Sequence, residues 1–146
     1  MGVNQSDTVW KFAKEPVSEE SLHRAEMALG VILPQAVKEV YLHVNGGGPR
    51  PNRFETTQGR EVRLRYMLPV GEDYPDNFVA TNKRMRQAIP DPNLVLIAND
   101  DFGNFFCVDT KMAGRLRLFF WHHESQKLEP IRQRDADSLY SIMINQ

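Results

Sequence analysis

One cluster and one single residue in the sequence carry side chains that could take part in chemistry. His122, His123 and Glu124 are three consecutive candidate metal ligands. Adjacent strand residues point to opposite faces, and no further ligand follows at the spacing of a metal site, so we predict no metal site here. Cys107 lies between apolar neighbours, where a thiol acts as a small hydrophobe with a raised pKa and not as a nucleophile.

A glycine run and a polar turn also suggest ligand binding. A phosphate-binding loop needs a strand before its glycines and a helix after them, whereas Gly46–Gly48 follow an expected helix and precede Pro49. The run is therefore interpreted as the end of a helix. The segment 99–104 resembles a calcium loop in composition only, because its spacing lacks alternating ligands and Asp and Asn are common turn residues. We can name no nucleophile with a base, so we expect neither an enzyme nor a cofactor.

Two acidic clusters remain as candidates for contact with a partner. The first is Glu72, Asp73 and Asp76, and the second is Asp100 and Asp101. Both fall on expected loops, where a scaffold can vary its surface without losing its fold. The alternative interpretation is that these are ordinary solvated turn residues.

The elements that must position these residues are indicated by apolar spacing and by capping residues. Ser18 and Gly30 predict the ends of a helix over 19–29. A second helix follows Pro34, with Val37, Val40, Tyr41 and Val44 on one face.

The remaining segments predict an antiparallel sheet with further helices. Two apolar runs, 94–98 and 105–108, flank a turn at Gly103 or Asn104 and predict a hairpin at the centre of the sheet, where both faces of each strand are covered. Trp121 is expected to be buried against this hairpin. The other expected elements are a loop over 50–59, strands over 60–67, 115–121 and 128–131, a helix over 78–88, and a last helix capped by Asp135 or Asp137. The residues expected to serve the structure are Pro34, Asn45, Gly46, Gly103, Asp109 and Trp121.

These elements give an α+β fold, with a mostly antiparallel mixed sheet flanked by helices. The 146 residues fit one domain over 18–146, preceded by an N-terminal arm over 1–17. The net charge of −1 gives no attraction to nucleic acid, and no apolar run reaches the ~20 residues of a membrane span. A single cysteine and a polar N-terminus favour the cytoplasm.

Taken in order, four segments of the chain resemble the SUKH superfamily, which includes bacterial immunity proteins and yeast cell-wall regulators of the Smi/Knr type. The segments are Leu29-Gly30-x-x-Leu33-Pro34, Tyr41-Leu42-x-x-Asn45-Gly46-Gly47-x-Pro49, the run from Leu96 to Asp109, and Leu118-Phe119-Phe120-Trp121-x-His123-Glu124. The resemblance covers residues 18–145. It implies a mixed sheet flanked by helices and a non-enzymatic protein that commonly binds and neutralises a cognate toxin, often a nuclease. The alternative it leaves open is a regulatory scaffold, as in the eukaryotic relatives.

Overall fold

The structure is a computed structural model in which part of the chain is described. The backbone is described for residues 9–50, 52–89, 91–111 and 116–144, and the side chains for these residues except 9–13 and 139–144.

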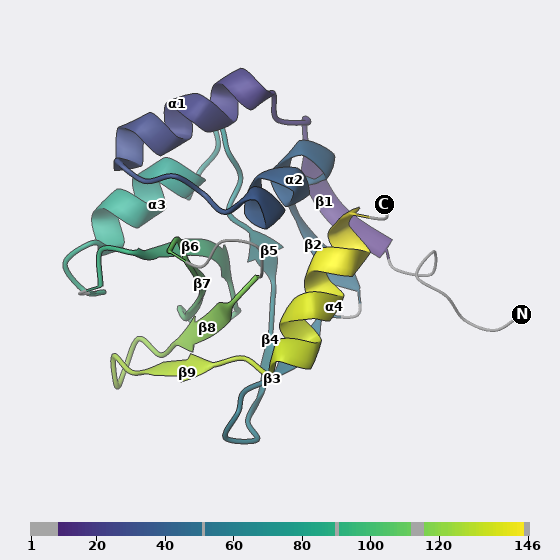
Figure 1. The fold of residues 1–146 in the computed structure, drawn as a ribbon, viewed down its shortest axis with the longest axis vertical. Helices are drawn as coiled ribbons and strands as arrows, with labels where there is room; N and C mark the ends of the chain where they lie inside the picture. Colours follow the sequence, from purple (N-terminus) through teal and green to yellow (C-terminus); the bar gives the residue numbers. More distant parts are fainter. Residues whose placement is uncertain (1–8, 51, 90, 112–115, 145–146) are drawn as a thin grey trace, which may run out of the picture.

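The centre of the fold is an antiparallel sheet of five strands (Figure 1). In spatial order these strands are β5 (Tyr66–Met67), β6 (Leu94–Asn99), β7 (Phe105–Asp109), β8 (Leu118–Trp121) and β9 (Leu128–Pro130). The hairpin β6–β7 lies at the centre of this order, as the sequence predicts. Its strands are buried on both faces because both apolar runs are covered by other elements.

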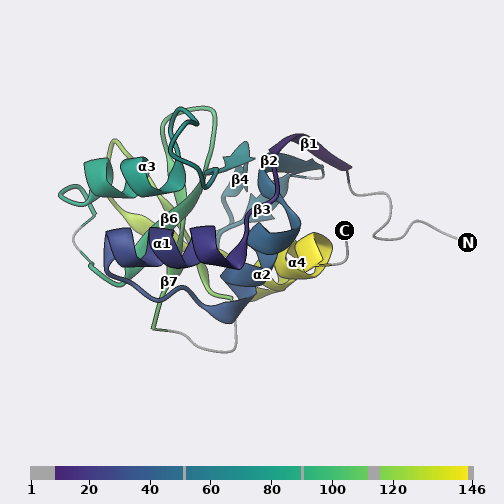
Figure 2. The ribbon, with the colours of Figure 1, turned by 90° about the horizontal axis from the view of Figure 1, so that it is seen from above.

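The helices lie in two pairs, of which the first contacts the five-stranded sheet through α3 and β6, and the second contacts β2 and β3. Helix α1 (Glu19–Leu29) lies beside α3 (Phe78–Met85), and α2 (Gln35–His43) lies beside α4 (Gln133–Ile144), as Figures 1 and 2 show. The predicted ends of α1 are confirmed: the Ser18 hydroxyl accepts a hydrogen bond from the Ser21 amide, and Gly30 is left-handed at φ 69°.

The segment 1–17 contains a strand that the sequence analysis did not expect. Strand β1 (Val9–Lys14) pairs antiparallel with β2 (Asn45–Arg50), so the glycine run that ends α2 continues as a strand. Glycine is required there because a Cβ on Gly48 would lie 2.0 Å from the Arg65 carbonyl oxygen. Residues 1–8 of the predicted arm lie outside the described residues.

The region over 50–67 also differs from the expectation of one loop and one strand. Strand β3 (Arg53–Glu55) falls inside the expected loop and pairs with β4 (Glu61–Arg63), after which the chain changes partner and β5 pairs with β6. The segment 60–67, which the alternating pattern predicts as one strand, forms two short strands because they pair with two different neighbours. This division depends on the neighbours and not on the local pattern.

The last helix begins earlier than predicted. Helix α4 begins at Gln133, and Asp135 lies inside its first turn, where its carboxylate accepts a hydrogen bond from the Glu55 amide (2.8 Å). The side chain is thus used to attach β3 to the helix and not to cap it.

The fold class is α+β, as predicted, and every strand pair among the described residues is antiparallel. One core connects sheet and helices. Trp121 belongs to it, being 2% exposed and paired with Phe105 across β7 and β8, which confirms the expected burial. Within the described residues, none of the helices has both the length and the apolar character needed to cross a bilayer.

Candidate partner-binding site

The acidic loop between β5 and α3 carries two uncompensated charges. Glu72 and Asp73 are exposed, and within the described part of the chain neither carboxylate has a hydrogen-bond or ion-pair partner. Asp76, the third acidic residue predicted here, lies 3.6 Å from the Arg84 guanidinium. The negative charge of the loop is therefore concentrated at Glu72 and Asp73.

Both ends of the acidic loop are fixed by asparagine side chains. Before the loop, buried Asn45 accepts a hydrogen bond from the Val70 amide (2.8 Å) and donates to the Val70 carbonyl (3.0 Å). After it, Asn77 caps α3 by accepting from the Ala80 amide (2.9 Å). Asn45, which the sequence analysis assigned to the structure, thus positions the loop that carries the candidate binding residues.

A groove of about 350 Å³ lies beside these carboxylates, between α1, the acidic loop and the start of α3. We call it the α1–α3 groove. Its apolar lining comes from Ala25, Ala28, Val70 and Val79. Its charged lining is Arg24, Glu72 and Asp73. Arg24 forms an ion pair with Glu20 (2.5 Å), so its charge is already compensated.

The second predicted acidic cluster is built differently. Asp100 is buried, and its carboxylate accepts hydrogen bonds from the amides of Phe102 and Asn104 (both 2.8 Å) and from the Asn104 side chain (2.9 Å). Gly103 completes the turn at φ 88°. Exposed Asp101 forms an ion pair with Arg65 (3.3 Å).

The two acidic clusters line separate hollows. Asp100 and Asp101 line one of about 300 Å³ next to β4, whereas Glu72 and Asp73 line the α1–α3 groove. The carboxylate of Asp100 is buried and hydrogen-bonded within the turn, whereas Glu72, Asp73 and Asp101 are exposed. That either cluster contacts a partner stays a prediction.

The paired histidines have separate partners. Strand β8 ends at Trp121, after which His122 Nε2 contacts Glu129 Oε1 and His123 Nδ1 lies 2.8 Å from Asn104 Oδ1. Among the described residues, no three His, Cys, Asp or Glu side chains are grouped as ligands for a metal ion.

Sequence reasoning missed the buried carboxylate of Glu129, on β9. It is 4% exposed and accepts hydrogen bonds from Thr56 (3.1 Å), Arg60 (2.8 Å) and His122. Burial by itself would raise the pKa of this carboxyl, but the hydrogen bonds from His122, Arg60 and Thr56 and the charge of Arg60 outweigh it and lower the pKa. No local signal could have found this site, because two of its three partners, Thr56 and Arg60, come from a distant segment.

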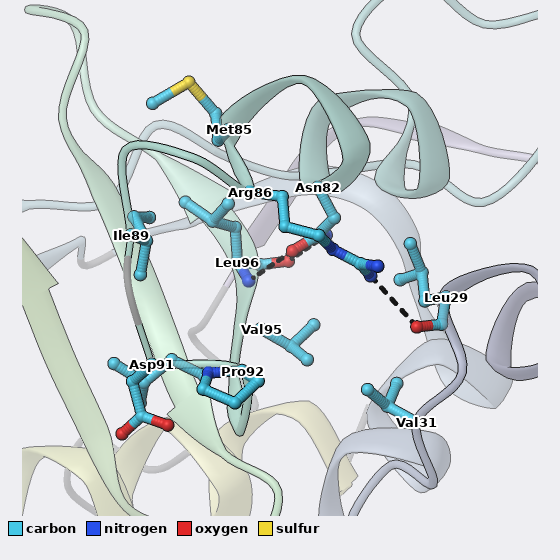
Figure 3. Close-up of a pocket in the computed structure, with 11 residues that line it drawn as sticks. Leu29, Val31, Asn82, Met85, Arg86, Ile89, Asp91, Pro92, Val95 and Leu96 are labelled. Carbon is cyan, nitrogen blue, oxygen red and sulfur yellow. Dashed lines mark hydrogen bonds between the residues drawn. The ribbon is translucent and has the colours of Figure 1, made fainter.

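Two further features offer little to a ligand. A cavity of about 30 Å³ lies under α3, where Arg86 donates to the Leu29 carbonyl (3.0 Å) and Asn82 is bonded to the backbone of Leu96 (Figure 3). Its size suits one or two water molecules. Cys107 is fully buried, and burial raises the pKa of its thiol to about 12, as the sequence analysis expected.

Comparison with known families gives one match. The model of the SMI1 / KNR4 family (SUKH-1) matches residues 16–141, which include the α1–α3 groove, the acidic loop and the β6–β7 hairpin. No curated protein gives a significant match.

Proposed function

Because the chain belongs to the SMI1 / KNR4 family (SUKH-1), we propose that it is a non-enzymatic protein-binding module of the immunity type. In this proposal it binds a cognate protein toxin in the cytoplasm and blocks the toxin's active surface. The toxin we expect is an enzyme that acts on a polyanion, such as a nuclease.

The observation that carries this proposal is the uncompensated acidic loop. An enzyme that binds nucleic acid has a basic binding surface, since it must neutralise phosphates. Two exposed carboxylates without internal partners, Glu72 and Asp73, supply the complementary charge. Such complementarity speeds association and sets the orientation of the complex.

The chemistry of the described side chains supports binding over catalysis. The single thiol, on Cys107, is buried and protonated at neutral pH. The buried carboxylate of Glu129 is held by three donors. A thiol that substrate cannot reach and a carboxylate that is fully hydrogen-bonded are poor candidates for a nucleophile or a general base.

The experiment is a growth rescue followed by a binding measurement. Large open reading frames next to the gene are expressed with and without this protein, and we expect one of them to stop growth unless this protein is present. Purified toxin is then titrated with wild type and with the double variant Glu72→Lys/Asp73→Lys, at low and high salt. We expect the double variant to bind at least tenfold more weakly at low salt, with a smaller difference at high salt.

The control for location is Glu124→Lys, which reverses one exposed charge on the loop between β8 and β9 and is compared with the single variant Glu72→Lys. Its affinity should equal that of wild type. If no product of a neighbouring gene is toxic, or if this protein gives no protection against it, the immunity proposal is wrong. A regulatory scaffold is then the better hypothesis.

A further inference from the structure

We infer that the α1–α3 groove is an anchor site that receives one arginine side chain from the surface of a partner protein. This inference rests on the proposed function and adds to it the chemistry of the contact. It is argued from the lining of the groove, its charge and the rigidity of its walls.

The lining suits the aliphatic stem of a long basic side chain. Ala25 and Ala28 lie on one face of α1, and Val70 from the acidic loop and Val79 from α3 complete the apolar lining. Alanine leaves room that a larger residue would fill, and the methylenes of arginine pack well on such surfaces. A volume of about 350 Å³ is near the lower end of ligand pockets, which span roughly 300–1,000 Å³, so a single side chain suits it better than a large cofactor.

The charge around the groove favours a cation. Among the described residues that line it, Arg24 is the single cation, and it contacts Glu20 and the Ser21 hydroxyl (3.2 Å). Glu72 and Asp73 remain unpaired within the described chain. We choose arginine over lysine because a guanidinium can donate to two carboxylates in a fixed plane and is more weakly hydrated than an ammonium.

The walls of the groove are fixed before a partner arrives. Helix α1 is capped at both ends, by Ser18 and Gly30. The acidic loop begins at Val70, whose backbone is hydrogen-bonded to the Asn45 side chain. It ends at Asn77, which caps α3. A preformed groove loses little conformational freedom on binding, which is the condition for an effective anchor.

The test is a titration of the full-length, ¹⁵N-labelled protein followed by NMR. The probe is a capped Gly-Arg-Gly tripeptide, and the matched probe replaces arginine by citrulline, which has a similar shape and no charge. We expect the arginine peptide to give saturable shifts at the amides of Ala28, Gly71 and Val79, with at least tenfold weaker binding of the citrulline peptide. Shifts that do not saturate, equal binding of the two probes, or shifts located elsewhere would overturn the inference.

Two variants separate shape from charge. Ala28→Leu fills the groove from an exposed helical position without changing any charge, and Glu72→Gln/Asp73→Asn removes the charge without changing the groove. We expect each to weaken binding of the arginine peptide at least fivefold, while Glu124→Gln binds like wild type. Circular dichroism confirms that each variant is folded, and unchanged binding in both folded groove variants would overturn the inference.

The cognate toxin distinguishes this inference from the proposed function. If charge reversal weakens toxin binding but folded Ala28→Leu binds the toxin like wild type, the anchor site is wrong and the immunity proposal stands. If the arginine peptide binds the groove but no toxin is neutralised, the anchor site stands and the immunity proposal is wrong.

Discussion

Single side chains in this protein show how burial and hydrogen bonding decide the role of a charged group. Glu129 is buried with three donors, Asp100 is buried with two amides and a side-chain donor, and Glu72 is exposed with no partner in the described chain. The first two stabilise connections inside the fold. The exposed carboxylate of Glu72 can contact a partner protein. The candidate site is therefore identified by the exposure of its carboxylates and by their lack of partners in the described chain, more than by residue type.

Glu129→Gln tests the buried network. Because the folded-state pKa of Glu129 is lowered, its stabilising contribution is present above the unfolded-state pKa, near 4.3, and is lost as the pH falls through the folded-state value. We expect the variant to lose roughly 1–3 kcal/mol of unfolding free energy at pH 7 and to lose less stability than wild type on acidification below about pH 4. Urea unfolding at a series of pH values measures both effects. Parallel acid profiles for the two proteins would contradict the assigned role.

Trp121→Ala tests the core beside the central hairpin. The side chain is 2% exposed and lies opposite Phe105, so its removal leaves a large cavity. We expect a loss of roughly 3–5 kcal/mol in unfolding free energy. Phe102→Ala is the control, because Phe102 is 76% exposed at the hairpin turn and its loss should change stability by less than about 0.5 kcal/mol. Equal effects of the two substitutions would show that the indole is not part of the core.

Among the elements, strand β2 depends most on its glycines. It lies between β1 and the segment around Arg65, and a Cβ on Gly48 would lie 2.0 Å from the Arg65 carbonyl oxygen. The clash is with backbone, which cannot rotate away as a flexible side chain would. The glycine run therefore has two roles: it follows the end of α2, and it allows β2 to approach the backbone of Arg65 closely.

We therefore expect Gly48→Ala to lower the unfolding free energy by at least ~3 kcal/mol, the upper end of the usual range for overpacking substitutions. Gly59→Ala is the matched control, since a Cβ there meets no atom within 4 Å and is opposed only by the left-handed backbone at φ 88°. That strain should lower the unfolding free energy by about 1–2 kcal/mol. Thermal and urea unfolding of both variants give the comparison, and a Gly48→Ala variant as stable as Gly59→Ala would contradict the close approach.

In the whole molecule, the two-stranded sheet β3–β4 and the five-stranded sheet are joined by contacts between segments far apart in the chain. Thr56 bridges to Ile131, the Thr57 amide donates to the Pro130 carbonyl (2.8 Å), and Asp135 of α4 accepts from the Glu55 amide. These connections attach β3 to the end of β9 and to the start of α4. They make the two-stranded sheet β3–β4 part of the same core.

We therefore predict one cooperative unfolding transition for the full chain. Far-ultraviolet circular dichroism, which follows the helices and strands, and near-ultraviolet circular dichroism, which follows packed aromatic rings, should give the same midpoint in urea. Two separated midpoints would show that the molecule contains more than one folding unit. This experiment also tests the single-domain prediction over 18–146.

The sequence by itself determined the features that depend on near neighbours. Ser18 and Gly30 specify both ends of α1 because capping is local, and the apolar runs of β6 and β7 specify a covered hairpin because both faces need burial. The exposed acidic loop could be named as a candidate for the same reason: Glu72 and Asp73 lie in a segment without apolar spacing.

Only the tertiary structure decided the features built by segments far apart in the chain. The pairing of β1 with β2 joins residues 9–14 to the glycine run, and Thr56 and Arg60, from the segment after β3, reach Glu129 on β9. The α1–α3 groove needs α1, the acidic loop and α3 together. Strand pairing, the burial of a carboxylate and the shape of a groove depend on which segments pack against each other. Local residue patterns do not specify this packing.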